Sequence, residues 1–100
     1  MIHTYAAVFS DDEESKNCHV SFPNFSYETD IAYSDKADLL RKASEELGFA
    51  MWMCEEAGRK MPKPNTISER GLREGESIKF IDCDYDRIKQ SISVTSFNLA

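Results

Sequence analysis

The chain has 100 residues, which is enough for one domain but not for two. Hydrophobic residues make up 41% of it, which excludes a disordered chain, and no apolar run is long enough to cross a bilayer. The formal net charge of -6 argues against nucleic-acid binding, which needs clustered Lys and Arg. It would attract a basic partner, although on charge alone solubility is the simpler explanation.

The sequence begins with two elements that predict a β-hairpin. Ile2–Phe9 is rich in β-prone residues and predicts a strand. The polar run Asp11–Asn17 predicts an exposed turn. Cys18–Phe22 predicts a second strand, in which Cys18, Val20 and Phe22 share one side.

A third strand is expected after Pro23, which cannot donate to a β-ladder. Within Ser26–Ile31, alternation places Tyr27, Thr29 and Ile31 on one side of this strand. Glu28 and Asp30 then lie on the other side.

The strongest periodic pattern predicts a helix. Ser34 or Asp35 would be its N-cap, and Gly58 would end it. Gly48, inside the helix, favours close approach of another backbone, such as that of the sheet. The expected apolar stripe consists of Leu40, Ala43, Leu47, Met51 and Cys54.

The remaining segment predicts a linker, a last core strand and a short tail. Pro62 begins an extended linker that runs to Ser77. Ile78–Cys83 carries apolar residues on both faces, which predicts a strand with neighbours on each side. Asp84–Gln90 would form a short helical turn, and Ile92–Phe97 alternates like another strand.

The order β-β-β-α-β predicts the α+β class, in a two-layer domain with one helix packed on an antiparallel or mixed sheet. One sheet face would then have no helix over it, and it must meet water or a partner. The short tail would follow the last core strand.

The residues that could carry chemistry point away from catalysis. The number of cysteines is odd, and no two have metal-ligand spacing, so free thiols in a reducing cytoplasm are expected for Cys18, Cys54 and Cys83. Met1–Phe9 lacks the features of a secretory signal, which also fits the cytoplasm. No phosphate loop, nucleophile elbow or zinc motif is present. We therefore expect no enzyme activity, no metal and no cofactor.

Met51–Cys54 places four bulky residues in a row late in the helix. Successive helical residues differ by about 100°, so these four cannot all face one core. Core packing remains the first interpretation, and an oligomer interface formed by Trp52 or Met53 is the alternative.

Six segments resemble, in the same order, those of one family. Tyr5–Phe9, an acidic turn and Val20–Phe25 are similar to its first strand, polar turn and V-x-F-P-D-L segment. Asp38–Leu47 has the Ala and Leu spacing of its helix. Lys60–Ile67 resembles its I-P-x-P-S exit, and Ile78–Asp86 its final V-x-L-I-x-V-D-L-D strand. The family is that of the HicB-like antitoxins, from bacterial HicA/HicB toxin–antitoxin systems.

The resemblance implies a partial ribonuclease-H-like fold that has lost catalysis. A working site of that kind needs carboxylates that converge on magnesium, one of them on the first strand, and Ile2–Phe9 carries none. The implied partner is a small basic HicA-like ribonuclease toxin, which the acidic antitoxin would inhibit sterically, alongside a homodimer or higher oligomer of the chain.

The resemblance also implies a division of the chain. Residues 1–90 would form the toxin-binding domain. Residues 91–100 would be a tail, at most the first strand of a DNA-binding or dimerisation module, so operator DNA binding is not expected for the chain as given.

Charge suggests which residues would contact the toxin, although each could equally be solvated surface. Two further hypotheses stay open: a stand-alone oligomerising or regulatory domain without a toxin, and a degenerate ribonuclease-H-like nuclease. The predicted partner-binding residues are Asp11, Asp12, Glu13, Glu14, Glu28 and Asp30.

Overall fold

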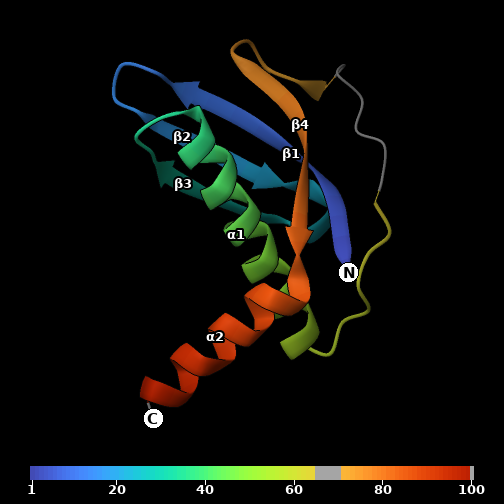
Figure 1. The fold of residues 1–100 in the computed structure, drawn as a ribbon. Coiled ribbons are helices and arrows are strands. Elements are labelled where there is room, and N and C mark those ends of the chain that lie inside the picture. Colours follow the sequence, from blue (N-terminus) through green and yellow to red (C-terminus); the bar gives the residue numbers. More distant parts are fainter. Residues whose placement is uncertain (65–70, 100) are drawn as a thin grey trace.

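The computed structural model describes residues 1–64 and 71–99, and the side chains of this part as far as residue 92. Four strands form one antiparallel sheet in the order β3-β2-β1-β4 (Figure 1). Helix α1 lies across one face of this sheet, and helix α2 follows β4. The predicted two-layer α+β class is therefore confirmed, with the sheet purely antiparallel and with a second helix added.

The first three strands form the predicted meander. They are β1 (Ile2–Asp12), β2 (Asn17–Phe22) and β3 (Tyr27–Ala32). β1 runs beyond the predicted Phe9 because Asp11 and Asp12 pair with Cys18 and Asn17 across the hairpin. The predicted alternation in β2 is confirmed: Cys18, Val20 and Phe22 are fully buried, whereas His19 is exposed.

A tight corner joins β2 to β3. The 3-10 turn Pro23–Phe25 directly follows β2, and Ser26 closes it with a left-handed φ of 50°. The Ser26 N–H donates to the carbonyl of Pro23 at 3.3 Å. This corner reverses the chain so that β3 pairs with β2.

Helix α1 spans Lys36–Glu56, and both of its ends carry the predicted signals. The Asp35 side chain caps the start, because it accepts a hydrogen bond of 2.8 Å from the backbone N–H of Asp38. Gly58 ends the helix at φ 72°, and its N–H donates to the carbonyl of Glu55. With the bond from the Arg59 N–H to the carbonyl of Cys54, this is a Schellman motif.

The predicted stripe on α1 is partly wrong. Ala43, Leu47 and Met51 are fully buried, as expected, but Leu40 is 41% exposed and Leu39 is buried in its place. Leu39 and Leu40 both fit helical spacing from Ala43, at i-4 and i-3, so the first turn was ambiguous in sequence.

Strand β4 (Glu76–Asp84) lies at the edge of the sheet and pairs only with β1, so the prediction of neighbours on both sides is wrong. Ile81 and Cys83 face α1 and are buried, whereas Phe80 on the other face is 65% exposed. The apolar residues on both faces of β4 thus reflect a core on one side and an apolar surface on the other.

Helix α2 (Tyr85–Leu99) replaces both elements predicted for the end of the chain. The turn expected for Asp84–Gln90 is helical from Tyr85 on, but the helix continues through Ile92–Phe97, where a strand was expected, and Asp84 belongs to β4. Tyr85, Ile88 and Ile92 recur at helical spacing, and all three pack against the core. The alternation in Ile92–Phe97 was too short to decide between strand and helix.

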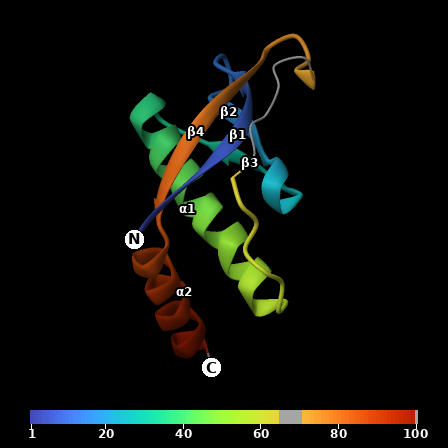
Figure 2. The same ribbon diagram turned by 90° about the vertical axis from the view of Figure 1, so that its right-hand side faces the viewer.

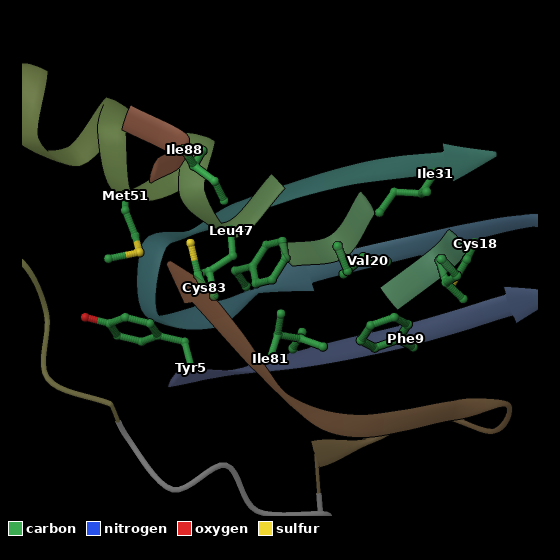
Figure 3. Close-up of a cluster of buried hydrophobic side chains, with 14 of the residues drawn as sticks. Tyr5, Phe9, Cys18, Val20, Ile31, Leu47, Met51, Ile81, Cys83 and Ile88 are labelled. Carbon is green, nitrogen blue, oxygen red and sulfur yellow. The ribbon is translucent and has the colours of Figure 1, made fainter. Parts of the chain in front are cut away.

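The core fills the space between α1 and the sheet (Figure 3). Tyr5, Phe9 and Ile81 extend from the sheet toward Leu47 and Met51 of α1. Ile88 brings α2 against α1, where a Cβ built on Gly48 would lie 2.5 Å from its Cγ2. Close approach at Gly48 was expected, but the partner is this side chain of α2 and not the sheet.

Candidate partner-binding surface

The sheet face opposite α1, which we call the helix-free face, is acidic. Within the four strands, the register puts no Lys or Arg on this face, and the one basic strand residue, Lys79, lies on the other side over the Phe9 ring. The carboxylates whose strand positions face this way are Asp12, Glu28, Asp30, Glu76, Asp82 and Asp84.

An apolar strip crosses the same face on β1 and β4. Val8 pairs with Ile78 and both are half-buried, whereas Ala6, which pairs with Phe80, is fully buried. Phe80 is 65% exposed, and Ile2, farther along β1, is 59% exposed. Exposed apolar groups rimmed by charge are typical of interaction surfaces, so this strip could serve as the centre of one.

His19 lies between two carboxylates on this face. Its Nδ1 is 2.7 Å from Asp30 Oδ1, and its Nε2 is 3.7 Å from Glu28 Oε2. The hydrogen bond to Asp30 is the main cause that raises the pKa of His19 above its usual 6.5, and Glu28 adds to the effect. Protonation of His19 therefore removes one unit of net negative charge from this part of the face.

A shallow hollow of about 540 Å³ adjoins His19. Val8 and Ser21 line it from the sheet, and Leu72 and Arg73 line it from the segment before β4. Glu28 and Glu76 also line it, so the hollow joins the acidic half of the face to the apolar strip.

The structure separates the six acidic residues predicted for partner binding. Glu28 and Asp30 lie together on the helix-free face, with side chains about 70% exposed (71% and 68%). Asp11 faces α1, where it accepts hydrogen bonds of 2.6 Å from both Tyr33 Oη and Lys36 Nζ. Lys36 is the main cause that lowers the pKa of Asp11.

The other three predicted acidic residues lie around the hairpin turn. Glu13 forms an ion pair with Lys36 at 3.2 Å. Asp12, whose strand position also faces the helix-free side, accepts a hydrogen bond from the backbone N–H of Ser15, and Glu14 is exposed. The hairpin acids are therefore partly neutralised within the chain, which leaves the helix-free face as the main acidic surface.

Trp52 and Met53, the predicted oligomer residues, are both half-buried and lie in different surroundings. Trp52 stacks on Phe49 with ring centroids 5.8 Å apart. Met53 lines another hollow, beside Phe25 and Tyr27. The two residues thus do not form one patch.

Sequence reasoning missed the apolar strip and the His19 cluster. Phe80 was expected in the core because the pairing partner of its strand was unknown. The alternation of β2 and β3 could have placed His19 on the same face as Glu28 and Asp30, although only the register shows that His19 pairs with Asp30.

In the described part of the chain, no three His, Cys, Asp or Glu side chains gather in a way that could hold a metal ion. None of the described helices is long and apolar enough to cross a membrane.

Comparison with known proteins identifies the fold. No family model matches the chain, and no curated protein matches it. A solved structure described as a toxin–antitoxin complex from Streptococcus pneumoniae contains a chain that superposes with a TM-score of 0.66 at 21% sequence identity. The match covers 87% of this chain and 72% of that one, so the two share a fold over most of their length.

Proposed function

We propose that this chain is the antitoxin of a toxin–antitoxin pair and that its helix-free face binds and covers a basic toxin. The observation that carries the proposal is the composition of that face. Six carboxylates and no Lys or Arg occupy its strand positions, around the exposed Phe80. Although Arg73 lies at the hollow beside this face, the strand positions themselves are acidic, and an acidic surface with an apolar centre suits a basic partner.

Two further observations support a toxin as the partner. The fold is shared with a chain of a toxin–antitoxin complex. The segments from Tyr5 to Asp86 resemble HicB-like antitoxins, which implies a partial ribonuclease-H-like fold and a small basic HicA-like ribonuclease as the toxin. The acidic charge of the chain, -6, fits the antitoxin half of such a pair.

Inhibition would be steric. Phe80 and Ile2 are the apolar side chains that lose most exposed surface when a partner covers the face, and they would anchor it. Glu28 and Asp30, on the same face but on β3 at the opposite edge of the sheet from β4, would meet Lys or Arg of the toxin and orient it. No residue of this chain would take part in chemistry.

Co-purification tests the proposal. The chain is expressed with the small basic protein encoded beside it, a tag is placed on one of the two, and affinity and RNA cleavage are measured together. We expect a stable complex in which RNA cleavage is suppressed. If the two proteins stay separate while the basic protein cleaves RNA at its full rate, the antitoxin function is wrong.

A further inference from the structure

Helices α1 and α2 enclose a second surface, a groove of about 280 Å³ on the opposite side of the molecule from the proposed toxin contact. The helices meet where Ile88 packs on Gly48. Beyond this contact, α2 extends away from the sheet (Figures 1 and 2). The residues that line the groove are Glu45, Glu46, Phe49, Arg87, Ile88, Ser91 and Ile92.

The floor of this groove is apolar and partly open to solvent. Phe49 is 37% exposed, and Trp52 stacks against it. Ile92, on α2, is half-buried. These side chains form an apolar surface that the rest of the described chain does not cover, which is the usual mark of an interface.

The rim of the groove carries charges of both signs. Glu45 and Glu46 lie on α1, and Arg87 lies opposite on α2. Arg87 is exposed and forms no ion pair with any carboxylate in the described part of the chain. Glu45 is 54% exposed and has Arg41 as its only ion-pair partner among the described residues.

We propose that the groove binds the groove of a second copy of this chain about a two-fold axis. Such an interface uses the same patch twice, so the patch must contain its own complement. An acidic edge on α1, a basic edge on α2 and an apolar floor between them meet this requirement, with Arg87 of each copy against Glu45 of the other. The acidic helix-free face does not meet it, because two copies would repel each other there.

This pairing is independent of the proposed toxin contact, since it uses the opposite layer of the molecule. Phe49 and Ile92 of the two copies form the centre of the interface. Trp52, behind Phe49, is covered by the same contact, whereas Met53 in its separate hollow is not.

Sedimentation equilibrium of the purified chain tests the proposal, together with a charge-swap series. We expect a dimer for the wild type, and for Glu45→Arg or Arg87→Glu alone a dimer weakened about tenfold or more, because each change creates two like-charge contacts. Arg59→Glu and Glu14→Arg, which change the net charge equally at exposed sites outside the groove, leave dimerisation within about threefold.

A mixture of the two single variants tests the contact between Glu45 and Arg87 most directly. Glu45→Arg and Arg87→Glu proteins each repel themselves but attract each other, so an equimolar mixture regains the dimer, and the double variant dimerises alone. Circular dichroism melting confirms that every variant is folded. A wild type that stays monomeric up to roughly 1 mM, or single variants that dimerise as well as the wild type, would overturn the proposal.

Discussion

Gly48 is the point at which the packing of α2 on α1 can be tested most sharply. Replacement by Ala would put a Cβ 2.5 Å from Ile88 Cγ2, 2.9 Å from its Cδ1 and 3.0 Å from its Cβ. The last of these atoms is fixed to the backbone of α2, so a rotation of the Ile88 side chain cannot relieve the overlap. The two helices must move apart instead.

The size of the effect follows from two opposing quantities. Overpacking of a tight contact costs about 1–3 kcal/mol. Ala in place of Gly within a helix returns about 1 kcal/mol. We therefore expect Gly48→Ala to lower the free energy of unfolding by roughly 1 kcal/mol, which lowers the Tm by about 4–8 °C in a domain of this size.

A double-mutant cycle with Ile88→Ala isolates the contact, by urea unfolding at fixed temperature. Ile88→Ala alone is expected to cost about 2–5 kcal/mol, because Ile88 is only 6% exposed. In that background Gly48→Ala becomes less destabilising than in the wild type, because Cγ2 and Cδ1, the two nearest atoms, are gone and only the 3.0 Å contact with the Cβ at position 88 remains. If Gly48→Ala stabilises the otherwise unchanged protein, α2 does not pack on α1 as described.

Three other predictions concern single residues. His19 should titrate above its usual pKa of 6.5, and Asp30→Asn should lower that pKa, as NMR of the imidazole will show. Because folding raises the pKa of His19, the stability contributed by the His19–Asp30 pair is present below about pH 6.5 and is lost as the pH rises through the folded pKa. A His19 titration that Asp30→Asn leaves unchanged would contradict this interaction. Asp35→Ala should cost about 1 kcal/mol in thermal or urea unfolding through the lost N-cap, whereas Asp12→Ala, outside any helix, is the control and should cost less than about 0.5 kcal/mol. Phe80→Ser should change stability by less than about 0.5 kcal/mol, since Phe80 is 65% exposed, yet weaken toxin binding at least about tenfold in calorimetry; a large loss of stability would place Phe80 in the core.

Local patterns predicted much of this fold. The alternation in Cys18–Phe22 identified the buried side of β2, and Asp35 and Gly58 marked the ends of α1. Each of these signals depends on residues a few positions apart, so the sequence alone contains the necessary information.

The errors arose where distant residues decide the structure. β4 is an edge strand because it pairs only with β1, and nothing near Phe80 records its pairing with Ala6, 74 positions earlier. Likewise, α2 depends on the docking of Ile88 against Gly48. The sequence identified the acidic residues but not which of them share a face. Asp11 faces α1, where it pairs with Lys36, whereas Glu28 and Asp30 lie on the helix-free face.

The proposal that the helix-free face binds the toxin is tested most directly by comparing the toxin affinities of two matched charge-reversal variants. The double variant Glu28→Lys/Asp30→Lys changes the helix-free face, and Glu13→Lys/Glu14→Lys makes the same change in net charge at the hairpin turn. Isothermal titration calorimetry measures the Kd of each with the basic protein encoded beside this chain. We predict that the first variant loses at least about tenfold in affinity, equivalent to about 1.4 kcal/mol, while the second stays within about threefold of the wild type. Equal losses in both variants, or a larger loss at the hairpin, would contradict the assignment of the helix-free face as the toxin-binding surface.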